Sequence, residues 1–307
     1  MLDEEFEGPE SAEVNDSNTY VFGRINEHNV VIGCLPGGQY GTNAAAVVAN
    51  NMIRSFTNLR FALMVGIGGG APTQDTDIRL GDVVVSEPRG QLGGVVQVDL
   101  GKRLPDGTFE RKGQLDKPPP VLVGALPHMK RQYNDPRKPD RIAEHIKLMD
   151  DWPGYQRPTE DRLYRADYLH EGGNTCQDCA AENLVVRSPR PTDRVVAVHY
   201  GTIASSNSVI KNSAVRDRYA QELKVLCFEM EAAGLTDTFR CLVIRGICDY
   251  SDSHKNDAWH NYAALAAAAY AREVLHMLKP ERVSSMPSWT EDIKQSEYYS
   301  ILPVLSS

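Results

Sequence analysis

The chain lacks any run of about 18 apolar residues, the length that a membrane-spanning helix needs. Its first ten residues are acidic and lack the positive start and apolar centre of a secretory signal peptide. Only 6 of the 307 residues are cysteines, which without such a signal indicates reduced thiols rather than a disulfide framework. We therefore expect a soluble, cytoplasmic protein with no membrane partner.

Positive charge is also scarce, because 33 Lys and Arg residues face 41 Asp and Glu residues and give a formal net charge of −8. A nucleic-acid partner is disfavoured by this balance. The composition, 41% hydrophobic and 24% charged, is typical of one large α/β core, and no internal repeat is visible. These features favour a single domain that acts on a small molecule.

The most informative stretch covers residues 226–252 and predicts a strand, a helix and a strand. Val225–Phe228 is a short apolar run, Glu229–Phe239 has helical spacing, and Cys241–Cys248 is rich in β-forming residues and stops at Asp249. In sheets of parallel strands joined by helices, ligands gather at the carboxyl ends of the strands. The stretch therefore predicts a ligand site at its two strand ends.

Three carboxylates, those of Glu229, Glu231 and Asp249, fall at these ends. A carboxylate can accept hydrogen bonds from vicinal ribose hydroxyls, and a second one can hold the proton that a departing purine needs. An alternative is structural, because acidic residues are favoured at helix N-termini and Glu229 and Glu231 fit that position equally well.

Residues 228–233 (Phe-Glu-Met-Glu-Ala-Ala) and 246–252 (Gly-Ile-Cys-Asp-Tyr-Ser-Asp) resemble the paired signature of the purine and uridine phosphorylase superfamily, in particular its nucleosidase branch. The chain is most similar to the fungal form found at the N-terminus of nucleotide-binding, ankyrin-repeat or tetratricopeptide-repeat receptors. The resemblance implies ribose contacts for Met230 and Glu231, with Glu229 beside them. It implies base recognition and protonation for Asp249.

The same resemblance implies an α/β fold of three layers, with a mixed central sheet flanked by helices. It also implies a homo-oligomer that needs no cofactor and that can form part of a larger receptor. Family members open with a strand and a helix whose end is similar to residues 1–5 here, so we expect the first strand of the sheet to be missing. That expectation leaves a catalytically silent nucleotide-binding or oligomerisation module as an alternative to an enzyme.

A glycine-rich run, residues 66–72, follows the apolar strand predicted at Arg60–Val65. Glycines let a backbone approach a ligand closely, although a tight turn without a ligand explains them equally well. The resemblance implies that Gly66, Gly68 and Gly69 border the ribose and the nucleophile.

Two positions next to these glycines distinguish hydrolysis from phosphorolysis. Phosphorylases of this family carry an arginine and a hydroxyl residue where this chain has Met64 and Ile67. Neither side chain can bind a phosphate dianion, because the methionine lacks a charge and both lack a donor. We therefore expect hydrolysis of an N-glycosidic bond in a purine nucleoside or nucleotide such as ATP, with phosphorolysis as the alternative.

A polar turn is predicted after the strand at Arg194–Ala204. By resemblance, Ser205, Ser206, Val209 and Ile210 line the base. Related nucleosidases stack a phenylalanine on the purine, and Val209 in that place removes the aromatic contact.

An insertion at 126–192, where apolar periodicity fades, contains a Cys-x-x-Cys pair, Cys176 and Cys179, close to His170. These three residues are candidate zinc ligands, and His199 is a fourth only if the fold brings it near. A thiol-bearing surface loop or a redox-labile pair is the alternative.

Residues 1–17 are expected to form an acidic N-terminal segment, 18–279 the nucleoside phosphorylase-like domain, and 280–307 a tail or linker. Within the domain, alternating residues at Thr19–Arg24 and Asn29–Leu35 predict a hairpin.

Overall fold

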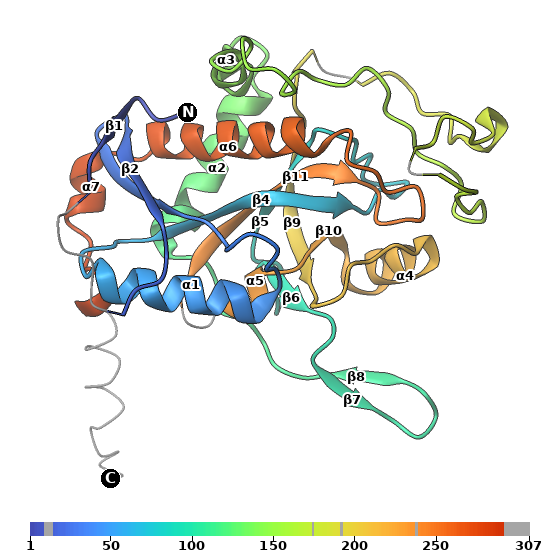
Figure 1. Ribbon diagram of the computed structural model, residues 1–307, viewed down its shortest axis with the longest axis horizontal. Helices are drawn as coiled ribbons and strands as arrows, with labels where there is room; N and C mark the ends of the chain where they lie inside the picture. Colours follow the sequence, from blue (N-terminus) through green and yellow to red (C-terminus); the bar gives the residue numbers. More distant parts are fainter. Residues whose placement is uncertain (9–14, 174, 191–192, 237–238, 292–307) are drawn as a thin grey trace.

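A computed structural model describes residues 1–8, 15–173, 175–190, 193–236 and 239–291 (Figure 1). None of the helices in these ranges combines the length and apolar character needed to span a bilayer. The strands are β1 (Glu4–Phe6), β2 (Tyr20–Ile25), β3 (His28–Gly33), β4 (Ala62–Gly70), β5 (Val83–Ser86), β6 (Val95–Gln97), β7 (Gly101–Arg103), β8 (Phe109–Arg111), β9 (Val198–Ser205), β10 (Val225–Glu229) and β11 (Cys241–Asp249). The helices are α1 (Thr42–Ser55), α2 (Pro120–Asn134), α3 (Arg141–Lys147), α4 (Ser213–Leu223), α5 (Ala232–Leu235), α6 (His260–Met277) and α7 (Pro280–Ser284), with a 3₁₀ turn at Ala181–Asn183.

The central sheet is mixed and closes on itself. Its strand order is β10–β4–β11–β5–β9–β6, and β10 also pairs with β9. β4 and β11 run parallel, as do β9 and β10, whereas β10–β4 and β11–β5 are antiparallel. Helix α6 lies along one side of this sheet and α1 along the other (Figure 1). The predicted α/β fold with a mixed central sheet flanked by helices is confirmed.

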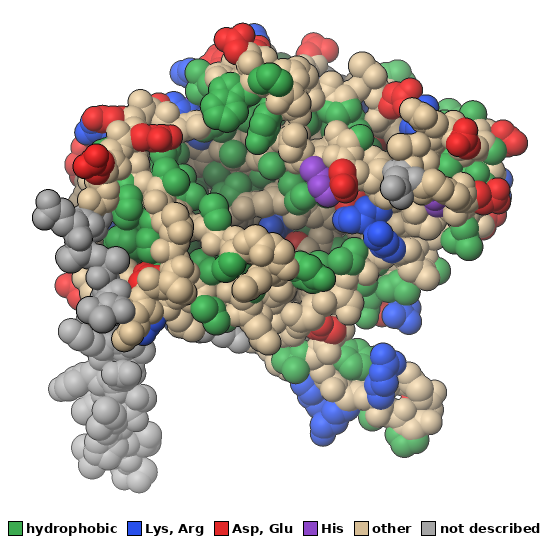
Figure 2. All heavy atoms as spheres, viewed as in Figure 1, with side chains coloured by type: hydrophobic (Ala, Val, Ile, Leu, Met, Phe, Trp, Pro, Cys, Tyr) green, Lys and Arg blue, Asp and Glu red, His purple; other side chains and the backbone are tan. Residues whose placement is uncertain are grey.

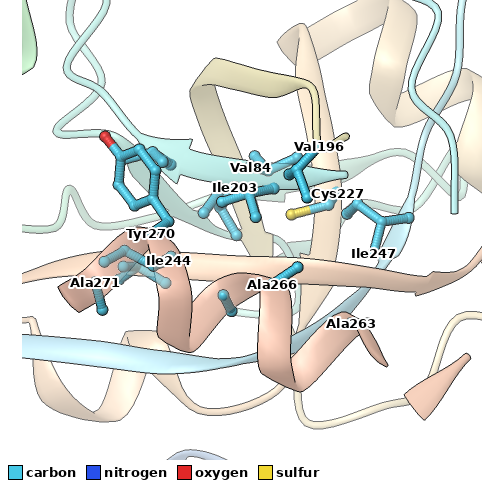
Figure 3. Close-up of a cluster of buried hydrophobic side chains, with 14 of the residues drawn as sticks. Val84, Val196, Ile203, Cys227, Ile244, Ile247, Ala263, Ala266, Tyr270 and Ala271 are labelled. Carbon is cyan, nitrogen blue, oxygen red and sulfur yellow. The ribbon is translucent and has the colours of Figure 1, made fainter. Parts of the chain in front are cut away.

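The core forms where α6 packs on β11 and its neighbours (Figure 3). Ala263, Ala266 and Tyr270 of α6 are fully buried against apolar strand residues such as Ile244. The small alanines let the helix approach so closely that a Cβ at Gly246 would lie 1.8 Å from the carbonyl oxygen of Ala263. Every residue of β11 is buried, which explains its nearly continuous apolar sequence.

Strand β4 is less covered than β11. β11 pairs along most of its length, while β10 pairs only with Gly69 and Gly70 at its end. Among the described residues, no other strand pairs with β4, and Val65 is 41% exposed. One edge of β4 therefore has no partner strand in the residues that precede Gly69.

The beginning of the chain differs from the sequence-based expectation. Residues 1–5 were expected to resemble a helix end, but Glu4–Phe6 forms β1, which pairs antiparallel with β2. Arg272 of α6 donates a hydrogen bond to the carbonyl of Met1 at 2.6 Å and forms an ion pair with Asp3. β1 thus lies before the domain start expected at residue 18, although it belongs to the same small sheet as β2 and β3. The hairpin formed by β2 and β3 agrees with the prediction.

Two other segments pack more closely than their sequence suggested. The insertion was expected to begin near residue 126, yet Leu122, Leu126 and Met129 of α2 are buried in the main core. In the expected tail, Trp289 is buried and its ring lies 4.9 Å from that of Phe239. The rest of that predicted tail, residues 292–307, lies outside the described residues.

Candidate active site

Arg245, in the middle of β11, organises the residues of the signature. Its side chain is 5% exposed, and its guanidinium forms ion pairs with Glu229 and, at 3.2 Å, with Glu231. A buried arginine needs such partners, because an unpaired charge costs several kcal/mol when removed from water. Arg245 therefore connects β11 to the segment that leaves β10.

Glu229 ends β10 and is fully buried. One of its oxygens, Oε2, accepts hydrogen bonds from the backbone N–H groups of Glu231 at 3.0 Å and Ala232 at 2.9 Å, as well as from Arg245. This carboxylate satisfies the first N–H groups of α5, the structural role that its position at a helix start allowed. The helix is shorter than the predicted Glu229–Phe239, and residues 237–238 lie outside the described part.

Glu231 is the more accessible of the two glutamates. Its side chain is 16% exposed, and its oxygens face Arg245 and the backbone N–H of Gly41, which lies 3.5 Å away at the start of α1. Met230, beside it, is also partly exposed. Arg245 and Gly41 thus hold the carboxylate of Glu231, while part of this side chain stays accessible, as a group that binds hydroxyls requires.

Asp249 lies at the carboxyl end of β11 and is 5% exposed. Its Oδ1 accepts from the N–H of Ser251 at 2.8 Å, and its Oδ2 pairs with the ammonium of Lys255 at 2.5 Å. Burial alone would lower the pKa of Lys255, but the ion pair with Asp249 outweighs it and raises that pKa above its usual value. Sequence reasoning missed Lys255, although a lysine six residues after a buried aspartate was a signal.

A histidine and a cysteine also border Asp249. Ligand atoms of Cys248, Asp249 and His260 all lie within 4.8 Å of one another. His260 is the first residue of α6; its side chain is 32% exposed, and its Nε2 lies 3.4 Å from Oδ1 of Asp257. Figure 2 shows this face of the molecule, hollowed at its centre, with a histidine and charged side chains beside the hollow.

The glycines of β4 make these approaches possible. They were expected in a loop, but Gly66, Gly68 and Gly69 lie within the strand. A Cβ at Gly69 would lie 2.5 Å from Oδ1 of Asp249, one at Gly66 would lie 2.1 Å from Nη1 of Arg245, and one at Gly68 would lie 2.7 Å from the carbonyl oxygen of Phe228. The described contacts of these glycines are therefore with the protein's own groups.

The predicted base-binding run is divided by the structure. Ser205 and Ser206 are buried at the end of β9, where the Ser205 hydroxyl accepts from the N–H of Ala233 at 3.1 Å and Ser206 donates its N–H to the carbonyl of Glu229. Val209 is 47% exposed, and Ile210 packs against a second apolar cluster. The two serines therefore adjoin the glutamate segment, while Val209 faces solvent.

The cysteine pair lies apart from the carboxylates. His170, Cys176 and Cys179 have their ligand atoms within 4.8 Å of one another, but the suggested fourth ligand, His199, is bound to Asp82 at 3.0 Å instead. Burial and the neighbouring Cys179 raise the pKa of Cys176 to about 11, which disfavours a reactive thiolate. The suggestion of His199 as a zinc ligand is therefore wrong.

A closed mixed sheet covered by helices, with carboxylates at the ends of β10 and β11, the two strands that flank β4, defines a mixed α/β protein. The chain belongs to the phosphorylase superfamily, whose family model matches residues 2–279.

Two named proteins are similar in sequence. A nucleotide-binding leucine-rich repeat (NLR)-like protein of Hyaloscypha variabilis is 46% identical over 284 residues, covering 92% of this chain and 28% of that protein. The ATP nucleosidase Cap17 of Escherichia coli is 36% identical over 86 residues, covering 26% of this chain and 17% of that protein. The chain thus spans only about a quarter or less of the curated relatives that it matches.

Solved structures agree on the fold. The 5'-methylthioadenosine/S-adenosyl homocysteine nucleosidase of Helicobacter pylori, complexed with a substituted pyrrolidin-3-ol, superposes with a TM-score of 0.53 at 14% identity, covering 90% of this chain and 88% of that one. The futalosine hydrolase of the same organism gives 0.51 at 15% identity, with the same coverage of both chains. At these identities the likeness shows the fold alone.

Proposed function

We propose that this chain cleaves the N-glycosidic bond of a purine nucleoside or nucleotide by hydrolysis. Asp249 takes part in protonation of the departing base, while Glu231 and Met230 bind the ribose. One observation carries the proposal: β11 supplies both Asp249 and Arg245, and Arg245 binds Glu231, so one strand positions both carboxylates. A β-bulge between Ile247 and Asp249 interrupts the alternation of side chains along the strand between these two residues.

The reaction needs a proton for the departing base and stabilisation of positive charge on the sugar, and each carboxylate contributes to one of these. Breaking the bond between C1′ and the purine nitrogen leaves an electron pair on the base and positive character on the sugar. The proton for the departing base comes from the ammonium of Lys255, which is hydrogen-bonded to Asp249, and passes through that carboxylate to the purine nitrogen. Glu231 accepts from the ribose hydroxyls and stabilises the positive sugar, which water then attacks at C1′, releasing a proton.

Hydrolysis is favoured over phosphorolysis by the surroundings of Met64. Nη2 of Arg245 lies 3.6 Å from the sulfur of Met64. Arg245 is already paired with two carboxylates, so a phosphate dianion there would compete with Glu229 and Glu231. An attacking phosphate would meet acidic groups, whereas a water molecule carries no charge to repel.

An adenine nucleotide such as ATP is the substrate that we propose to test first. The partial similarity to a named ATP nucleosidase supports it. The insertion arginines add no support, because Arg187 binds Asp161 at 2.8 Å and Arg162 binds Glu160 at 2.8 Å. A triphosphate would therefore have to extend towards solvent rather than towards these side chains.

Purified chain incubated with adenosine, inosine and ATP, with and without phosphate, tests the proposal when free base is measured by chromatography. Base release without phosphate supports hydrolysis and identifies the substrate class. Release only with phosphate would show a phosphorylase and overturn the argument from Met64. Circular dichroism of the same sample confirms that the tested chain is folded.

A silent nucleotide-binding module is the second candidate, and one observation favours it. Both oxygens of Asp249 already have partners within the protein, Ser251 and Lys255, so the carboxylate is stabilised without a substrate. Calorimetric binding of ATP or adenosine by a folded chain that releases no base would support this role. Such a module would suit a multidomain receptor of the kind that the NLR-like relative's name describes.

A further inference from the structure

The loop that carries the cysteine pair forms a compact cluster outside the carboxylate site. Cys176 and Cys179 enclose a turn in which the N–H of Cys179 donates to the carbonyl of Cys176 at 3.4 Å. Their sulfurs and a ring nitrogen of His170 all lie within 4.8 Å of one another. Two ligands of one tetrahedral zinc ion lie about 3.3–3.8 Å apart, so small movements would bring these three atoms onto one ion.

His254 stands beside this cluster and comes from a different part of the chain, the turn after β11. It is 7% exposed, and neither ring nitrogen has a hydrogen-bond partner. Its ring centroid lies 5.5 Å from that of His170 at an interplanar angle of 80°. Two imidazoles on one tetrahedral zinc have their centroids about 5 Å apart, given a metal–nitrogen distance of roughly 2.1 Å.

The surroundings orient the two histidines. Nε2 of His170 faces the carbonyl of Thr175 at 3.0 Å, so this nitrogen carries the hydrogen and Nδ1 keeps its lone pair for a metal. The ring of His254 stacks beside those of Tyr164 and Tyr168, with centroids 4.1 and 5.3 Å away. Neither buried nitrogen of this imidazole has a hydrogen bond, although Nδ1 lies 3.8 Å from Oδ1 of Asp252.

We propose that His170, Cys176, Cys179 and His254 bind a structural zinc ion. Two thiolates and two imidazoles match the tetrahedral sulfur and nitrogen set that zinc prefers, and the absence of a carboxylate from this set disfavours calcium or magnesium. His254 completes the site by turning its ring towards the other three ligands. This imidazole takes the place that His199 could not fill.

The ion would connect the insertion to the turn that follows β11, residues 250–255. The N–H of His170 donates to the hydroxyl of Ser253 at 2.9 Å, and the thiol of Cys176 donates to the carbonyl of His254 at 3.5 Å. Ser253 and His254 follow Asp249 and precede Lys255, so the zinc would fix the turn that places the Asp249 partner. A structural zinc contributes directly to folding free energy.

Metal analysis of the purified, reduced chain tests the proposal independently of any enzyme activity. The wild type should hold one zinc per chain after gel filtration, and a mercurial thiol reagent should release it, as measured with a colorimetric chelator. Cobalt exchanged into the site should give the intense visible bands of a tetrahedral thiolate complex. A folded chain that holds no zinc after dialysis against zinc, or a Cys176–Cys179 disulfide found by mass spectrometry, would overturn the assignment.

Variants separate the four ligands from unspecific binding. Cys176→Ser with Cys179→Ser should abolish zinc binding, and His254→Ala should weaken it at least about tenfold in competition with a chelator. Cys34→Ser and His128→Ala change an exposed cysteine and an exposed histidine and should retain full zinc content. If His254→Ala binds zinc as tightly as His128→Ala, the four-ligand site is refuted; the mercurial release on wild type decides the matter if the double variant does not fold.

Discussion

The ammonium of Lys255 lies 2.5 Å from Oδ2 of Asp249, so the carboxylate at the end of β11 is held by a charge six residues further along the chain. The turn between them also supplies the N–H of Ser251 to the other oxygen. A short local segment thus fixes one carboxylate, whereas Glu231 depends on Arg245 from the middle of the same strand.

Asp249→Asn should reduce base release about 10²- to 10⁴-fold, because an amide cannot give a proton to the departing purine. The measurement is the initial rate of base formation by chromatography, using the substrate found in the first screen. Asp151→Asn, on an exposed turn, is the matched control and should keep the wild-type rate. Equal rates for the two variants would remove Asp249 from the mechanism.

Arg245→Met should destabilise the chain by about 3–5 kcal/mol, because it leaves the buried carboxylate of Glu229 without its cation. Urea unfolding followed by circular dichroism measures the change. Adding Glu229→Gln should recover part of the loss, since the uncompensated charge is then gone. Arg137→Met removes an arginine that is 87% exposed and should change stability by less than about 0.5 kcal/mol.

Gly69→Ala should destabilise the protein by about 1–3 kcal/mol, because the added methyl would overlap the carboxylate of Asp249 and the hydroxyl of Ser251. Gly124→Ala is the control: it lies within α2 with no atom within 4 Å of its added Cβ, and should stabilise by up to about 1 kcal/mol. Thermal unfolding of both variants measures the contrast. A Gly69→Ala chain as stable as wild type would show that the glycine is not needed for packing.

Asp3→Asn should lower stability at neutral pH but not in acid. Although burial opposes it, the hydrogen bonds and charge of Arg272 and the backbone N–H of Asn26 lower the pKa of Asp3 below 3.8. A depressed carboxyl pKa contributes stability above the unfolded value, and this is lost as pH falls through the folded value. Urea midpoints of wild type and variant should therefore differ at pH values well above 3.8 and converge below it; a difference that persists in acid would contradict the ion pair.

Most strands could be predicted because buried strands read as apolar runs. Val83–Ser86 and Cys241–Asp249 appear as such, and the alternation around residues 20–33 predicts the hairpin. The glycines of β4 were expected after the end of a strand at Val65, as a turn or, by resemblance, as a segment that borders the ribose. Here side chains and backbone from neighbouring strands fill the space that a Cβ would need, and such a packing relation cannot be read from one segment.

The candidate site was only half accessible to sequence reasoning. Asp249 and the glutamates stand at predictable strand ends, but Arg245, which holds two of them, sits inside an apolar run. A charged residue in such a run must have a buried partner, and this signal could have singled it out. His254 gave no comparable signal, because it comes close to Cys176 and Cys179 only when the insertion folds over the turn that follows β11.

The closed ring of strands also has a kinetic consequence. β10 must pair with β4 and β9, and β11 with β4 and β5, although these segments lie far apart in the chain. Pairings of large sequence separation pay the loop-closure entropy before they gain contacts, so they form slowly. Glu231 and Asp249 are therefore brought together only as the ring closes, and a chain still emerging from the ribosome lacks the site until β11 has been synthesised.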